Sequence, residues 1–259
     1  MRGDLAAHCS TARTVPDRRM TAAQYYLKPN AFICPARRHW VILDVKQDRY
    51  LCLDKEEFEA LWPWLNGCQR TGSQESVGAA RMPPDTARLA AELVAREILS
   101  ESAHDAKPAT PTASITPTRC LAPAVAHPPV GPRLLHAPAF LRACAIADAR
   151  LRVKSIESTV RFITRRKQKC SKPDEFDWSK AARLISTFES LRLFYPRPYL
   201  CLFDSLALLD FLSHYSLFPT WVFGVIVEPF QAHCWLQQDD VVINDTVERV
   251  QIYSPIMCI

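Results

Sequence analysis

The sequence is poor in glycine and lacks the glycine-rich motifs that bind nucleotides. Only six glycines occur in 259 residues, and neither G-x-x-x-x-G-K-[ST] nor G-x-G-x-x-G is present. No cofactor is therefore expected from a recognisable motif. No apolar run approaches the ~20 residues needed to span a bilayer, so we expect no membrane segment.

The sequence also has little excess of positive over negative charge. The net charge is only +5, and lysine and arginine are scattered along the chain. A protein that binds nucleic acid is expected to carry one basic face. The composition therefore argues against a nucleic-acid partner.

Cysteine is abundant, but the spacing of zinc sites is missing. None of the ten cysteines forms a C-x-x-C pair, so we expect no metal site. The N-terminus has no apolar segment typical of a signal peptide. Without export the thiols stay reduced, and we expect a cytoplasmic protein.

Composition divides the chain into four parts. Residues 1–20 are expected to be a disordered tail, with Met20 as a second candidate start codon. Residues 21–105 form a small domain, and residues 106–133, which hold seven prolines between 108 and 132, form a flexible linker. Residues 134–259 form the second domain.

The small domain is expected to be of winged-helix type. Residues 24–53 alternate short β-branched and aromatic runs with turn residues, which predicts strands. Asp54 is expected to cap a first helix. A second helix is predicted over Asp85–Leu99, where Leu89 and Leu93 recur at helical spacing.

The second domain begins with helices and ends with strands. Residues 200–212 are apolar nearly all round, which predicts a buried helix. Strands are expected after Pro219, in TWVFGVIV, AHCWLQ and VVINDT. The fold class is therefore α+β, with helices packed on an antiparallel sheet.

Three residues of the second domain suggest nucleophilic catalysis. Cys201 follows Pro198 at the start of the buried helix, where the helix N-terminus lowers a thiol pKa. His233 is predicted on one strand and Asp245 on the next. The order favours Cys201 as nucleophile, His233 as base and Asp245 as the carboxylate that orients the imidazole.

The triad depends on the register of one hairpin. A three-residue loop at 238–240 pairs 233 with 245 and puts both side chains on one face of the sheet. A two-residue loop pairs 234 with 245 and would count against the triad. We predict the three-residue loop, with Asp240 in the left-handed conformation.

Less specific interpretations exist for each residue. A cysteine on an apolar helix is usually packed in the core, and a strand histidine is usually structural. Asp204 and His214 are interpreted as non-catalytic, and Cys234 as a core residue or one on the opposite face of the strand. Asn244 and Glu248 are the substitutes should Asp245 point away.

The second domain resembles the B proteins of lasso peptide biosynthesis. CLFDSLALLDFL, PTWVFGVIVEPFQAHCWLQ and VVINDTVERVQIY carry the resemblance, and PF-x-AH-x-W is its most specific part. The spacings 233 − 201 = 32 and 245 − 233 = 12 fit the family. The acidic Asp204 departs from the basic residue often found there. The resemblance implies a papain/transglutaminase-like cysteine endopeptidase.

The small domain supports the same resemblance. WVILDVKQDRYLCLD is similar to strands of the PqqD-like leader-recognition element. The resemblance implies that a precursor's leader peptide adds a strand to the sheet and lies against the second helix. The substrate-binding residues would be Tyr50, Leu51, Cys52, Leu53, Leu89 and Leu93.

The family also implies a partner and leaves two other functions open. The freed core peptide would pass to an asparagine-synthetase-like macrolactam synthetase, and ATP dependence is associated with the protease step. The same triad could serve an acyl-transfer or amide-forming enzyme. A non-catalytic leader-binding adaptor is the third alternative.

Overall fold

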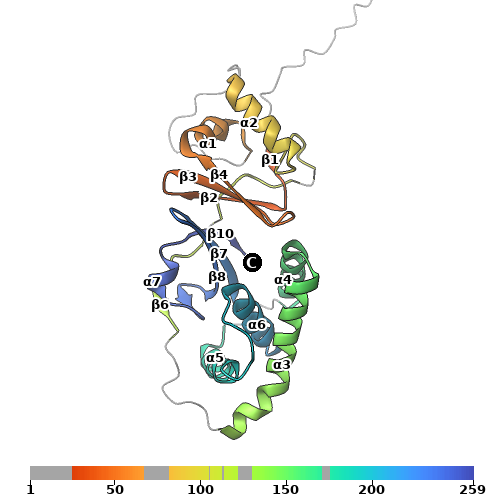
Figure 1. Cartoon of the computed structure of the whole chain (residues 1–259), viewed down its shortest axis with the longest axis vertical. Coiled ribbons are helices and arrows are strands. Elements are labelled where there is room, and N and C mark those ends of the chain that lie inside the picture. Colours follow the sequence, from red (N-terminus) through yellow and green to blue (C-terminus); the bar gives the residue numbers. More distant parts are fainter. Residues whose placement is uncertain (1–24, 67–81, 105, 113, 122–129, 171–175) are drawn as a thin grey trace, which may run out of the picture.

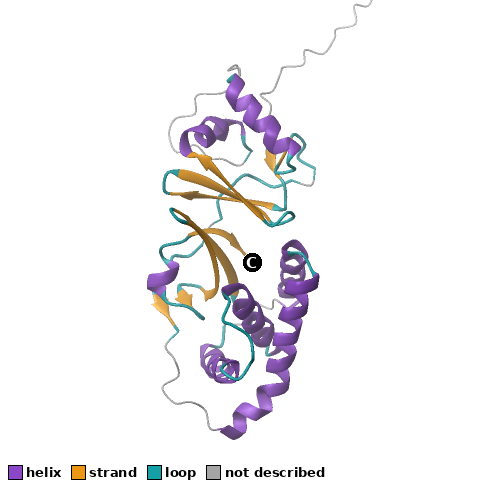
Figure 2. Ribbon diagram, viewed as in Figure 1, coloured by secondary structure: helices purple, strands orange, loops and turns teal. Residues whose placement is uncertain are grey.

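The computed structural model describes residues 25–66, 82–104, 106–112, 114–121, 130–170 and 176–259. The predicted tail and Met20 lie outside the described residues. The chain mixes helices and sheets, as the α+β prediction requires. Figure 2 shows a small upper part and a larger lower part in which helices flank one sheet.

The small domain is built on a three-stranded antiparallel sheet. Its strands lie in chain order, β2 (Ala31–Ala36), β3 (His39–Asp44) and β4 (Arg49–Asp54). Its helical elements are α1 (Lys55–Leu61), η1 (Trp62–Trp64) and α2 (Pro84–Ala95). A two-stranded sheet joins β1 (Tyr26–Leu27) and β5 (Leu99–Ser100).

The central strand β3 is covered on both faces. Ile42 of β3 belongs to the small domain's own core with Phe58 of α1 and Leu93 of α2. Val41 and Leu43 point to the other face and belong to the large core of the second domain. Figure 1 shows the sheet between α1 and α2 on one side and the strands β7 and β10 on the other. A continuous apolar run suits a strand covered on both sides.

The second domain places helices before strands, as predicted. Its helices are α3 (Val130–Val153), α4 (Ile156–Cys170), α5 (Trp178–Arg192), α6 (Cys201–His214) and the short α7 (Val247–Val250). Its strands are β7 (Thr220–Val227), β8 (Phe230–Gln238), β9 (Val241–Val242) and β10 (Ser254–Cys258). The sheet order is β10-β7-β8-β9-β6, where β6 is the short strand Arg119–Cys120.

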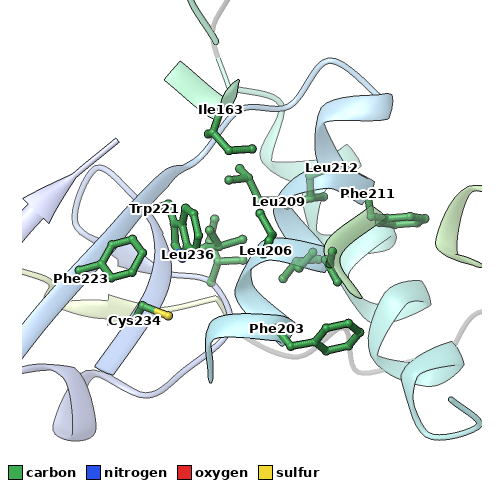
Figure 3. Close-up of a cluster of buried hydrophobic side chains, with 14 of the residues drawn as sticks. Ile163, Phe203, Leu206, Leu209, Phe211, Leu212, Trp221, Phe223, Cys234 and Leu236 are labelled. Carbon is green, nitrogen blue, oxygen red and sulfur yellow. The ribbon is translucent and has the colours of Figure 1, made fainter. Parts of the chain in front are cut away.

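Helix α6 lies at the centre of the second domain. It contacts α3, α5 and β8, so every side of it is covered. Figure 3 shows Leu206 and Leu209 of α6 beside Leu236 of β8. This burial explains why the helix is apolar nearly all round, and it fixes the position of the helix start.

The predicted linker is not a free spacer over its described residues. Ala109 is 0% exposed and packs in the small domain's core, and Thr112 Oγ1 donates to the carbonyl of Ile256 at 2.6 Å. Strand β6 (Arg119–Cys120) pairs in parallel with β9 and extends the large sheet. The expectation of a flexible tether is therefore wrong for these residues, because their backbone groups find partners in both domains.

Candidate active site

Cys201 occupies the first position of α6, as predicted. Leu200 is the N-cap residue, and the Cys201 side chain is exposed. Thiolates are favoured at this position, since the amide groups of the first turn and the helix dipole stabilise negative charge. Placement on a buried helix holds the sulfur at a fixed point of the surface.

A buried ion pair fixes the start of α6. Arg192, at the end of α5, is 2% exposed, and its Nε donates to Asp204 Oδ1 at 2.5 Å. Asp204 Oδ2 accepts the backbone N–H of Leu200 at 2.7 Å. Arg192 also donates to the carbonyls of Tyr195, Arg197 and Pro198. Asp204 is therefore structural, as predicted, and it holds the segment that precedes Cys201.

His233 and Asp245 form the predicted hydrogen bond. Nε2 of His233 lies 2.5 Å from Oδ2 of Asp245, and the side chains are 5% and 9% exposed. His233 and Cys201 line the same cavity, and hydrogen bonding between them shifts the pKa of each. Because Asp245 takes Nε2, Nδ1 is the ring nitrogen left for the thiol.

The predicted hairpin register is wrong. Gln237 pairs with Val242 and Gln238 with Val241, so the turn has two residues, and Asp239 rather than Asp240 has the positive φ of 53°. Strand β9 ends at Val242, and the chain leaves the ladder before Asp245. A continued ladder would have turned Asp245 away from His233.

Asn244 explains how the chain leaves the ladder. Its Oδ1 accepts the backbone N–H of Leu236 at 2.7 Å, and its Nδ2 donates to Ser205 Oγ at 3.0 Å. The side chain thus replaces a strand-to-strand backbone bond and ties the bend to α6. Asp245 is then free to turn towards His233, so neither substitute, Asn244 or Glu248, is needed for that contact.

The electrostatics favour a thiolate–imidazolium pair. Hydrogen bonds with Cys234 and then with His233 lower the pKa of Cys201 to about 4. Burial acts against charge on His233, but the hydrogen bonds with Asp245 and Cys201 raise its pKa to about 9. Burial also opposes charge on Asp245, yet its bonds with His233 and the Thr246 N–H hold its pKa below the ordinary value. Between these limits Cys201 is negative and His233 positive.

Cys234 is more than a core residue. It is 3% exposed, as predicted, yet it hydrogen-bonds with the sulfur of Cys201. That bond and burial raise the pKa of Cys234 well above its ordinary value, so it stays a thiol and serves as a donor. Sequence reasoning missed this role; its position beside His233 was the available signal.

Two cavities flank the three residues. One, of about 170 Å³, reaches Cys201 and His233 and is otherwise mostly apolar. The other, of about 330 Å³, lies beside Asp245 and includes Ser186, Glu189 and Thr246. The thiol is therefore open to a substrate on the side of the smaller cavity.

The predicted substrate-binding residues are not all accessible. Leu93 is 2% exposed in the small domain's core, so it does not face a peptide, and Leu89 is partly buried against that core. Leu51 and Leu53 also pack against it, whereas Tyr50 packs towards the second domain. Cys52 is exposed.

The described residues offer no metal centre. Among them, no group of three or more His, Cys, Asp or Glu side chains could hold an ion. The helices in this part of the chain also lack the combination of length and hydropathy that a membrane-spanning helix needs.

A thiol with a lowered pKa, an imidazole and a carboxylate, arranged between the two cavities, are suited to acyl transfer through a thioester. Residues 143–258 match the model of the transglutaminase-like superfamily. This part of the chain is thus a transglutaminase-like domain, of a superfamily that generally comprises cysteine-based enzymes. The match does not reach the small domain. Neither curated proteins nor solved structures gave a match.

Proposed function

We propose that the protein is the leader peptidase of lasso peptide maturation, a cysteine endopeptidase that cuts the leader from the core peptide. The observation that carries the proposal is the contact of His233 with both Cys201 and Asp245 at the exposed start of α6. The sequence resemblance to lasso B proteins supplies the substrate class.

The ionised pair gives the reaction its starting state. The Cys201 thiolate attacks the scissile carbonyl, and the oxyanion is stabilised at the start of α6. The His233 imidazolium donates its proton to the leaving amine as the C–N bond breaks. Water then attacks the thioester with His233 as base, which releases the leader's carboxylate and restores the thiolate. Asp245 orients the imidazole throughout.

The small domain is proposed as the PqqD-like leader-binding element. Among the described strands β4 pairs only with β3, so its other edge can accept a peptide strand. In an antiparallel addition the leader's C-terminal end lies beside the start of β4. Tyr50, at that end, lines the cavity of Cys201. Strand addition in this direction therefore brings the leader–core junction to the thiol.

A partner is part of the proposal. The core peptide released by cleavage carries a free amine, which an asparagine-synthetase-like enzyme would join to an activated side-chain carboxylate. This chain carries no recognisable nucleotide motif, so any ATP dependence of cleavage would be tested with that synthetase present. We place the reaction in the cytoplasm.

The test is incubation with the precursor peptide and measurement of peptide masses. Release of the intact leader, abolished by Cys201→Ala, is the expected result. Loss of one water from the precursor without cleavage would instead mean amide formation. Binding of the leader with no change of mass in either sample would reduce the protein to an adaptor.

A further inference from the structure

The cavity beside Cys201 has walls from both domains. The second domain supplies Leu202, Phe223 and Met257 around the thiol. The opposite wall comes from the small domain, through the end of β3, the β3–β4 turn and the start of β4. Its lining residues there are Leu43, Val45, Asp48 and Tyr50. The family match, at residues 143–258, includes none of these four.

This wall is held firmly against the second domain. Leu43 and Val45 are 3% and 2% exposed and share one buried cluster with Phe223 and Met257. The ring of Tyr50 lies edge-on to Phe230, with 5.3 Å between centroids. Strand β10 also contacts β2 and β3. A continuous core of this kind makes the wall part of the same rigid body as the thiol.

We propose that the β3–β4 wall completes a specificity subsite, which takes one apolar side chain from the acyl part of the substrate. This proposal rests on the proposed peptidase function, because it takes the acyl part of the substrate to be the leader peptide. The small domain would then have a second function besides binding the leader. It would determine which substrate residue is accepted next to the reacting carbonyl.

Size and lining define the chemical class of that side chain. A cavity of about 150 Å³ lined by aliphatic and aromatic side chains holds a molecule as large as benzene. The cavity here is about 170 Å³, which suits leucine or a side chain of similar size. Among the described lining residues Asp48 is the one carboxylate, and its charge disfavours an acidic side chain.

The experiment uses acetyl-aminoacyl chloromethyl ketones, which alkylate Cys201 with release of chloride. Glycine, leucine and glutamate versions are compared by the rate of mass increase of the full chain. Filling an apolar pocket gives roughly 10–200-fold discrimination, so the leucine probe should react at least about 10-fold faster than the glycine probe. Tyr50→Ala should reduce this ratio several-fold, and Asp48→Asn should raise the glutamate rate relative to leucine.

Ratios within each variant cancel any general change in thiol reactivity. Arg38→Ala, in the exposed β2–β3 turn outside the cavity lining, is the control and should keep the wild-type ratio. Ala232→Leu fills the cavity from its exposed rim and should slow the leucine probe selectively, which gives a second test should Tyr50→Ala not fold.

A leucine-to-glycine ratio near one in the wild type would overturn the proposal. So would a ratio that both Tyr50→Ala and Ala232→Leu leave unchanged. The labelling requires only a reactive thiol. If the precursor stays uncut while the labelling ratios shift in the variants, the peptidase function is refuted and the subsite is supported. If the precursor is cut but the ratios do not shift, the subsite is refuted and the peptidase function is supported.

Discussion

Gly224 of β7 lies directly opposite His233 of β8 in the antiparallel ladder. The imidazole packs against Trp235 and Tyr253, with ring centroids 6.0 and 5.1 Å away. A Cβ on Gly224 would stand 2.8 Å from Cβ of Tyr253 and 3.0 Å from two ring atoms of Trp235. One of the chain's few glycines therefore makes room for the two aromatic rings that pack against His233.

Gly224→Ala should lower both stability and activity. The contact to Tyr253 involves its Cβ, which cannot swing away, so the backbone or the rings must shift. Overpacking of this kind costs about 1–3 kcal/mol. The displaced rings should also move His233 and reduce kcat. Thermal unfolding and precursor cleavage are the measurements, with Thr220→Ala at the other end of β7 as control. An unchanged melting temperature would show that the structure accommodates the added methyl group without loss of stability, which would contradict the prediction.

The general plan of the site was predictable because it depends on local signals. Prolines before an apolar run place Cys201 at a helix start, and short apolar runs after Pro219 predict strands. The hairpin register was not predictable in this way. The chain turns at residues 239–240, and Asn244 then ends the ladder through side-chain bonds to Leu236 and Ser205. Such contacts leave no periodic trace in the sequence.

The contribution of the small domain to the cavity of Cys201 could not be predicted from the sequence either. Proline content indicated a flexible tether, which would have left the domains independent. In the structure Leu43 and Val45 join the core that contains Phe223. The run WVILDV predicted a strand, but periodicity alone does not say which element covers each of its faces.

Asp204→Ala should destabilise the fold by about 3 kcal/mol, because removing one partner leaves Arg192 buried with its charge uncompensated. Three carbonyl acceptors remain for that guanidinium, which favours the low end of the usual range. Chemical denaturation measures the change. Glu157→Ala, which breaks the exposed pair with Arg161, is the matched control and should cost about 1 kcal/mol or less. Equal losses in the two variants would contradict the anchoring role.

The pH dependence should report the ion pair. Cys201 has a pKa of about 4, so its thiolate forms as the pH rises through that value. His233 has a pKa of about 9, so its proton is present below that value and lost above it. Alkylation by iodoacetamide should therefore already be fast at pH 6, and peptide cleavage should fall as the pH passes 9. A thiol that reacts only above about pH 8, like a free cysteine, would refute the pair.

Cys234→Ala should shift the alkylation profile of Cys201 to higher pH. The bond from Cys234 is the largest cause that lowers the pKa of Cys201, and alanine removes the donor. Cys234→Ser keeps a donor and should shift the profile less. Cys144→Ser, at a buried cysteine that is not among the groups acting on the pKa of Cys201, should leave it in place. Superimposable profiles for Cys234→Ala and the wild type would exclude the bond.

Asp245→Asn should reduce kcat by about 10²–10⁴-fold while the fold is retained, because a neutral amide no longer favours the imidazolium and can bind the wrong tautomer of His233. The hydrogen bond with Asp245 raises the pKa of His233, so the upper limb of the activity profile should also move to lower pH. Asp239→Asn, in the exposed turn where φ is 53°, changes the same charge without touching His233 and should alter neither quantity. A loss of kcat without movement of the upper limb would mean that Asp245 only positions the ring, and an unchanged kcat would remove it from the site altogether.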